Sequence, residues 1–317
     1  MPKITVIGTI VRDTIYPYKG EPVYGWGGIY YTLSYLSGIL KEKAVLEPVF
    51  YVGYDVWDAV QELLSQKFPN VRKEGIRKIN QKNNRVTLKY LTPEHREEIS
   101  NFIPPPLPFE AIRPFVKNDI ILLNFISGYE ITFETCQRLV TEKTGFLYMD
   151  FHSLAYGRNE DGSRFYRRPE NWREWVRMPD FLQMNEKEAE TLAARPLTAL
   201  EDYTGFAEEL VQIGKNILNM TLGPKGSILA FLEKGTPVVH YLKALNVRRV
   251  VDVTGCGDSF AAGFIAKYIE TKDPVEAAKF GNVAGGLNCT FQSTSKADTI
   301  YLRVDEALND YNEAKPF

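Results

Sequence analysis

Short runs of β-branched and aromatic residues alternate with segments of helical period along nearly the whole chain. The runs predict strands at residues 4–10, 48–52, 120–125, 145–150, 181–184, 217–222, 227–231 and 238–242. The helical segments predict helices at residues 29–40, 56–67, 133–142, 186–194, 203–214, 258–271 and 274–288. The middle strands are apolar at successive positions, which indicates burial on both faces and parallel pairing. The pattern therefore predicts an α/β fold in which helices cover a mostly parallel central sheet.

Two stretches depart from this pattern. Residues 14–24 and 83–99 alternate between polar and apolar or aromatic positions, which is typical of half-exposed strands. We expect them to form a small β lid above the sheet, drawn from about residues 12–26 and 83–103, and we expect residues 1–317 to form one domain with that lid. A proline run at residues 103–108 returns the chain to the main body. Residues 152–177 show little periodicity and predict a long functional loop with a short helix.

Composition narrows the class of protein. The 317 residues carry 38 Lys and Arg against 40 Asp and Glu, so a basic nucleic-acid binder is excluded, and 44% of the residues are hydrophobic, so disorder is excluded as the main state. Three widely spaced cysteines predict neither disulfides nor structural zinc. No apolar segment approaches the roughly 20 residues of a membrane span, and the N-terminal apolar stretch is too short for a signal peptide. We therefore expect a cytoplasmic protein with no nucleic-acid or membrane partner.

The most informative motif is the run from Val250 to Phe264. A strand end leads into Gly255-Cys256-Gly257-Asp258, and an amphipathic helix follows. The glycines allow positive φ and close approach, so the amides of Gly255, Cys256 and Gly257 can converge on an anion at the helix N-terminus. Asp258 beside such a site provides the proton acceptor that phosphoryl transfer to a hydroxyl requires. Taken alone, the tetrapeptide also fits a tight turn with Asp258 as the helix N-cap.

The surrounding residues decide between these interpretations. The segment Asp252-Val-Thr-Gly-Cys-Gly-Asp-Ser-Phe260 resembles the signature of the ribokinase-like, or PfkB, carbohydrate kinase family. Further similarities follow in the family's order: Asp13 after the first strand, the diglycine Gly27-Gly28, Asn185 with Glu188, the loop Thr221-Leu-Gly223-Pro-Lys-Gly226, and Asn282. Alone, Asp13 reads as a strand-end turn residue, Asn185 and Glu188 as a helix N-cap and a solvated face, and Thr221 to Gly226 as a hairpin turn.

The resemblance implies a three-layer ribokinase-like sandwich with a small β lid, and an ATP-dependent kinase that uses Mg²⁺. It implies that Asp258 accepts the proton of the acceptor hydroxyl while the amides of Gly255, Cys256 and Gly257 stabilise the transferring phosphoryl group. Asn185 and Glu188 would hold the water shell of Mg²⁺. The remaining roles are nucleotide contacts by Thr221, Gly223, Gly226 and Asn282, and orientation of a small hydroxyl substrate by Asp13, Gly27, Gly28 and Thr32.

Several positions differ from the family pattern. Thr32 stands where the family usually has a sugar-binding Asn, and Asp150-Phe-His-Ser153 stands where many relatives have Asp-x-Asn-x-Arg. Tyr30 and Tyr31 either line the pocket or face the core. Cys256 replaces the usual Ala, either as a small residue or as a thiol whose pKa is lowered at the helix N-terminus. The resemblance also implies a monovalent cation, K⁺, beside Asp252 and Thr254.

The sequence leaves three functions open. A sugar or sugar derivative is the first expectation for the acceptor, and a nucleoside or inositol is the alternative within the family. The alternative of another class is a catalytically silent ribokinase-like binding protein. A dinucleotide-dependent oxidoreductase lacks support because no Gly-x-Gly-x-x-Gly follows the first strand. An exposed lid strand such as residues 86–91 would have unpaired edge groups, so a homodimer through the lid is expected.

Overall fold

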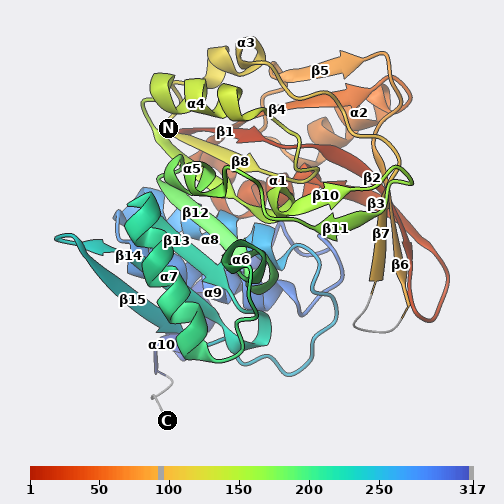
Figure 1. Ribbon diagram of the computed structural model, residues 1–317. Coiled ribbons are helices and arrows are strands. Elements are labelled where there is room, and N and C mark those ends of the chain that lie inside the picture. The colour runs from red at the N-terminus through yellow and green to blue at the C-terminus, as the bar shows by residue number, and fades with distance from the viewer. Residues whose placement is uncertain (92–95, 314–317) are drawn as a thin grey trace.

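The computed structural model describes residues 1–91 and 96–313, and Figure 1 shows a central sheet between two layers of helices. The nine strands follow the order β15-β14-β13-β12-β9-β8-β1-β4-β5. Pairing is parallel from β5 to β13, whereas β14 and β15 are antiparallel. These strands are β1 (Lys3–Ile7), β4 (Val45–Gly53), β5 (Ile76–Ile79), β8 (Ile120–Asn124), β9 (Phe146–Asp150), β12 (Phe181–Asn185), β13 (Ile217–Thr221), β14 (Ser227–Glu233) and β15 (Thr236–Leu242). The predicted α/β architecture with a mostly parallel sheet is confirmed.

Two hydrophobic cores separate the layers. Successive residues of one strand enter opposite cores, as Leu122 and Leu123 do, which explains why the middle strands are apolar at successive positions. One face carries α1 (Ile29–Leu40), α2 (Trp57–Lys67), α8 (Cys256–Thr271), α9 (Pro274–Asn288) and α10 (Ile300–Glu313). The other carries α3 (Phe109–Ile112), α4 (Phe133–Glu142), α5 (Trp172–Arg177), α6 (Glu186–Ala193) and α7 (Leu200–Gly214). Short 3₁₀ turns lie at Lys41–Lys43, Arg113–Phe115, His152–Ala155 and Gly223–Lys225.

A separate four-stranded sheet forms the lid. Its order is β3-β2-β6-β7, with β2 (Ile10–Tyr16), β3 (Val23–Gly28), β6 (Arg85–Tyr90) and β7 (Arg96–Ser100). The strands come from the two stretches set apart by their alternation, of which residues 92–95 lie outside the described part. Because β6 pairs with β2 on one side and β7 on the other, residues 86–90 are not a sheet edge. The prediction of an edge there was wrong: the lid's edges are β3 and β7.

Several elements differ from the sequence prediction. The first predicted strand is divided: β1 ends at Ile7 and β2 begins the lid at Ile10, with the Thr9 carbonyl accepting the Ile29 amide at 3.0 Å. Residues 152–177 contain the hairpin β10 (Tyr156–Arg158) and β11 (Arg164–Tyr166) before α5, and the hairpin lies beside the lid in Figure 1. The helix α10 was missed because its sequence is polar and, among its side chains that the structure describes, only Ile300 and Val304 are fully buried. None of the helices within the described residues has the length and apolarity that crossing a bilayer demands.

Candidate active site

Four polar residues end four neighbouring strands. Asn124, Asp150, Asn185 and Thr221 are the last residues of β8, β9, β12 and β13, and the sheet pairs Asn124 with Asp150 and Asn185 with Thr221. The carboxyl ends of parallel strands meet at one edge of a sheet, which is where open α/β sheets bind ligands. The helix α8 begins at this same edge, since Gln183 of β12 donates from Nε2 to the Gly257 carbonyl at 3.1 Å.

The start of α8 requires glycine. Gly255 is the helix N-cap with φ +78°, and a Cβ there would lie 2.8 Å from Tyr31 and 2.9 Å from the Tyr35 hydroxyl. The helix begins at Cys256, two residues before the predicted start. The Cys256 amide donates to the Val253 carbonyl at 3.3 Å, whereas the Gly257 amide has no hydrogen-bond partner among the residues that the structure describes. This free amide lies in the first turn of the helix, where the helix dipole favours a bound anion.

Asp258 is held by two polar side chains. Its Oδ1 accepts a hydrogen bond from Thr32 Oγ1 at 2.5 Å and another from Asn124 Nδ2 at 3.0 Å. Asn124 Nδ2 also donates to Thr32 Oγ1 at 2.8 Å, which closes a triangle. Burial raises the pKa of Asp258, while the Thr32 and Asn124 hydrogen bonds and the charge of His152 oppose that rise. The carboxylate thus has the raised basicity of a buried acid and a fixed orientation.

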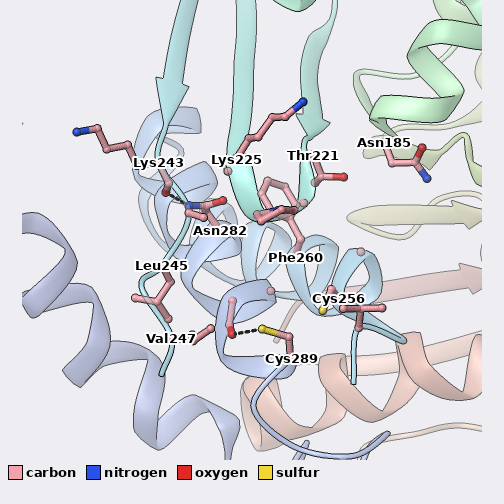
Figure 2. Close-up of a pocket in the computed structure, with 18 of the residues that line it drawn as sticks. Asn185, Thr221, Lys225, Lys243, Leu245, Val247, Cys256, Phe260, Asn282 and Cys289 are labelled. Atoms are coloured by element: carbon pink, nitrogen blue, oxygen red, sulfur yellow. Dashed lines mark hydrogen bonds between the residues drawn. The ribbon is translucent and has the colours of Figure 1, made fainter. Parts of the chain in front are cut away.

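Two cavities meet at the start of α8. The smaller, of about 500 Å³, lies under the lid and is lined by Asp258. The larger, of about 1060 Å³, lies on the other side of the α8 N-terminus and is shown in Figure 2. The residues common to both walls are Asn185, Thr221, Val253, Cys256 and Gly257. A molecule in one cavity can therefore touch a molecule in the other beside the Gly257 amide.

The diglycine serves the lid and the adjoining helix. Asp13 lies within β2 and not at a strand end, and it lines the smaller cavity. A Cβ on Gly27 would lie 1.9 Å from the Asp13 carboxylate, so only glycine leaves room for it. Gly28, with φ +63°, is the N-cap of α1 and lines the cavity. Thr32 is fully buried and does not line it; the structure places its hydroxyl on Asp258 rather than toward an acceptor.

The sequence did not identify several charged groups of the smaller cavity. Asp150, His152 and Arg164 line it, as does Glu98, whose carboxylate pairs with Arg164 at 2.8 Å. Burial raises the pKa of Asp150 to about 8. Burial opposes the charge of His152, but its hydrogen bond to Glu188 and the charges of Glu188 and Asp150 raise its pKa to about 9. Asn124 and Asp150 are paired at the ends of their strands. The sequence could have pointed to this pair only once the parallel order of the strands was known.

Asn185 and Glu188 form a capping box at the start of α6. Asn185 Oδ1 accepts the amides of Lys187 and Glu188, and Glu188 Oε2 accepts the Asn185 amide at 2.7 Å. Glu188 Oε1 accepts Asn185 Nδ2 at 2.6 Å and contacts His152 Nδ1 at 3.2 Å. Taken alone, Glu188 read as part of a solvated face; it is instead 1% exposed and lines neither cavity. Asn185 lines both, so Glu188 acts on the cavities through Asn185.

The predicted nucleotide residues line the larger cavity. Thr221, Gly223 and Gly226 form the turn between β13 and β14, so this segment is both a hairpin turn and a cavity wall. Asn282 is 8% exposed and is fixed by Ser227 Oγ, the Lys243 carbonyl and the Tyr311 hydroxyl. Apolar side chains complete this wall, among them Leu245, Val247, Val250, Val253 and Phe260.

Comparisons with known proteins agree with this geometry. The sequence profile of the pfkB family carbohydrate kinases matches residues 163–300, which contain the α8 signature and the larger cavity's wall. Over these residues the chain is similar to the pfkB family carbohydrate kinases. An uncharacterized sugar kinase from Archaeoglobus fulgidus is 38% identical over 82 residues, which cover 26% of this chain. That alignment spans 31% of the relative's own length, so the sequence likeness is local.

The ribokinase-like fold extends over the whole chain. The structure of a ribokinase from Thermotoga maritima superposes with a TM-score of 0.77 at 21% identity, covering 98% of this chain and 100% of the other. A pyrophosphate-dependent kinase in the ribokinase family superposes with a TM-score of 0.76 at 17% identity, covering 96% and 99%. The predicted ribokinase-like sandwich with a lid is confirmed by these likenesses.

Two departures from the PfkB pattern, the tyrosine pair and Cys256, have structural explanations. Tyr31 lines the smaller cavity, whereas Tyr30 packs against Phe68, with ring centroids 5.8 Å apart. The Cys289 thiol and burial raise the pKa of Cys256 rather than lowering it, which favours the interpretation as a small residue over that as a thiol of lowered pKa. The small-residue interpretation fits its place in the first turn.

The suggested K⁺ site does not fit the residues present. The Asp252 carboxylate accepts the amides of Thr254 and Ser293, both at 2.9 Å. The Thr254 carbonyl accepts Asn288 Nδ2, also at 2.9 Å. Hydrogen-bond donors thus lie where a cation would need unoccupied oxygens, and no step of the chemistry is assigned to K⁺.

Proposed function

We propose that this protein transfers the γ-phosphoryl group of ATP to a hydroxyl of a small polar acceptor, a sugar or sugar derivative. One observation carries the proposal: two cavities meet at the N-terminus of α8, and Asp258 lies on the side of the smaller one. The larger cavity would hold the donor and the smaller one the acceptor. Phosphoryl transfer needs this placement, because catalysis rests on positioning and on stabilising charge.

Asp258 would accept the proton of the acceptor hydroxyl as its oxygen attacks the γ-phosphorus. Thr32 and Asn124 hold the carboxylate in place and keep its pKa from rising further. The amides of the first turn, from Gly255 to Asp258, would stabilise the charge on the transferring group. Asp13 and Gly28 would orient the acceptor under the lid, which excludes water from the reaction.

The larger cavity favours a nucleotide over inorganic pyrophosphate as the donor. Its volume of about 1060 Å³ and its apolar wall of Leu245, Val247 and Phe260 suit a nucleoside. Pyrophosphate has no apolar part and would leave that wall exposed to water. Thr221, Gly223, Gly226 and Asn282 would border the nucleotide.

Mg²⁺ fits this site through its water shell. Asn185 lines both cavities but its oxygen caps α6, and both oxygens of Glu188 are engaged, so direct ligation by this pair is not what the contacts favour. Mg²⁺ usually keeps several waters, which Asn185 can contact. Bound there, the ion would neutralise charge on the donor phosphates. Glu188 would fix the orientation of Asn185, which is a positioning role.

The smaller cavity favours a polyhydroxylated acceptor because carboxylates line much of it. Asp13, Asp150 and Asp258 offer oxygen atoms to several hydroxyls at once. A nucleoside is the second candidate, since Tyr31 and the lid residues Val86 and Leu88 give the cavity an apolar wall against which a base can pack. A silent binding protein is disfavoured because Asp258 keeps both its partners. A homodimer would use the lid edge β3, because the outer side of β7 is bonded to the turn at residues 162–163.

The test is a phosphate-acceptor screen. Sugars, nucleosides and inositols are each incubated with Mg²⁺ and with ATP, GTP or pyrophosphate, and the Asp258→Asn variant is run beside the wild type. We expect a phosphorylated sugar with ATP and none with the variant. Turnover with pyrophosphate alone would contradict the donor, and nucleotide binding without any acceptor would revive the silent binding protein.

A further inference from the structure

Cys256 and Cys289 meet in the wall of the larger cavity. Cys256 is the first residue of α8, and Cys289 is the C-cap of α9, so two helix ends bring them together from positions 33 residues apart in the sequence. Both line the cavity, and Figure 2 shows both sulfurs at its lower end. The third cysteine, Cys136, is fully buried within α4 and lies in the other core.

The contacts around the pair hold the two sulfurs close. Each thiol lies close enough to the other to shift its pKa. Asn288 Nδ2 also donates to Cys256 Sγ at 3.4 Å, and the thiol of Cys289 donates to the Gly286 carbonyl at 3.0 Å. The Cys289 carbonyl accepts the Val251 amide at 2.7 Å, which ties the end of α9 to the segment leading into α8.

The two thiols differ in acidity. The hydrogen bond from Cys256 lowers the pKa of Cys289 to about 7, while the same contact and burial raise the pKa of Cys256. Cys289 is thus the more acidic thiol of the pair and the better nucleophile near neutral pH, and Cys256 is its neighbour. This is the arrangement of a reactive cysteine with a resolving partner.

We propose that Cys256 and Cys289 form a reversible disulfide that closes the donor site; this rests on the proposed function of the larger cavity. With hydrogen peroxide as oxidant, the Cys289 thiolate attacks one oxygen, the O–O bond breaks, and the departing hydroxide takes up a proton to give water and a sulfenic acid. The sulfur of Cys256 then attacks the sulfenic sulfur, its proton leaves with the hydroxyl as a second water, and the S–S bond forms. Two thiols and one peroxide thus give one disulfide and two waters, and a dithiol reverses the reaction.

Closure affects the donor site through geometry. Sulfurs of a disulfide lie about 2.05 Å apart, much closer than two thiols that are not bonded, so bond formation draws the two helix ends together. Cys256 lies between Gly255 and Gly257, whose amides face the proposed phosphate position. A shift there misplaces the anion site, and the bonded sulfurs also change the cavity wall.

The test measures cross-linking and nucleotide binding separately, without any acceptor. The native wild-type protein is treated with hydrogen peroxide, and the cysteines that remain free are then alkylated. Trypsin releases Cys256 in residues 250–267 and Cys289 in residues 280–296. We expect these two peptides joined, at least a tenfold loss of ATP affinity by calorimetry, and recovery of both with dithiothreitol. Bound ATP should slow the cross-link, since it covers the thiols.

Cys136→Ala is the matched control and should respond as the wild type does. Cys289→Ser should show no cross-link, and oxidation should leave its ATP affinity unchanged. Each oxidised protein is compared with its own reduced form. Peptides that remain separate would overturn the disulfide. A cross-link that leaves ATP affinity unchanged would overturn the switch. If ATP binding and cross-linking behave as expected but no acceptor is phosphorylated, the proposed kinase activity fails while the disulfide stands.

Discussion

Thr32 Oγ1 donates a hydrogen bond to Asp258 Oδ1 at 2.5 Å, although the two residues are 226 positions apart. Thr32 stands in the first helix and Asp258 in the first turn of α8, so the contact joins the two halves of the chain across the site. The Thr32 hydroxyl thus reaches the carboxylate of Asp258, and Thr32 does not line the smaller cavity. Through this hydrogen bond Thr32 would orient the Asp258 carboxylate, which is a positioning role.

Asp258→Asn should lower kcat by a factor of about 10²–10⁴, the usual contribution of a general base. The amide has nearly the shape of the carboxylate but cannot accept the proton, so ATP binding should persist. Steady-state kinetics and calorimetry with ATP measure the two effects. A variant with near wild-type kcat would remove Asp258 from the mechanism.

Thr32→Val should lower kcat about fivefold, because the lost hydrogen bond is worth about 1 kcal/mol and fixes the base. The Thr32 hydrogen bond lowers the pKa of Asp258, so its removal should move the acid limb of the kcat/KM profile to higher pH. Thr32→Ser keeps the hydroxyl and should leave that limb in place. An unmoved limb in the valine variant would mean that Thr32 only fills space.

Asp150→Asn tests the raised pKa of a cavity carboxyl. Burial raises the pKa of Asp150 to about 8, so the folded protein holds this proton more tightly than the unfolded chain does. The free energy of unfolding should therefore fall, relative to the variant, as pH rises from about 4 to about 8. Denaturant unfolding of both proteins across this range measures the difference. A difference that grows with pH in the opposite sense would contradict the assignment.

Gly257→Ala should reduce turnover, whereas Gly255→Ala should reduce stability. A Cβ on Gly257 meets only Gln183 Nε2 at 3.5 Å, which is an ordinary contact, so the fold should tolerate alanine there. The methyl group would occupy the junction of the two cavities, and turnover should therefore fall at least tenfold. At Gly255 the positive φ and the approach of Tyr31 should cost about 1–3 kcal/mol of stability. Thermal unfolding and kcat of both variants separate the two effects; equal loss of stability in both would refute the distinction.

Much of the fold was predictable because it rests on local periodicity. Runs that are apolar at successive positions, such as Ile120 to Leu123, require burial on both faces wherever they occur, and that condition fixes parallel pairing. The division of the first strand at Gly8 and the helix α10 were not predictable, because each depends on what packs against it. The interior position of β6 in the lid likewise depends on strand order, which alternation does not encode.

The sequence by itself determined the class of fold, the glycine-rich turn before α8 and the order of the motifs that resemble the PfkB family, since each depends on neighbouring residues and on backbone conformations that only glycine adopts easily. Only the tertiary structure decided that Thr32 and Asn124 hold Asp258, that Glu188 is buried behind Asn185, and that Cys256 lies against Cys289. These pairs come from separate elements, and the packing of helices on the sheet sets their distance. A sequence pattern records which side of an element is buried, but not which remote residue it meets there.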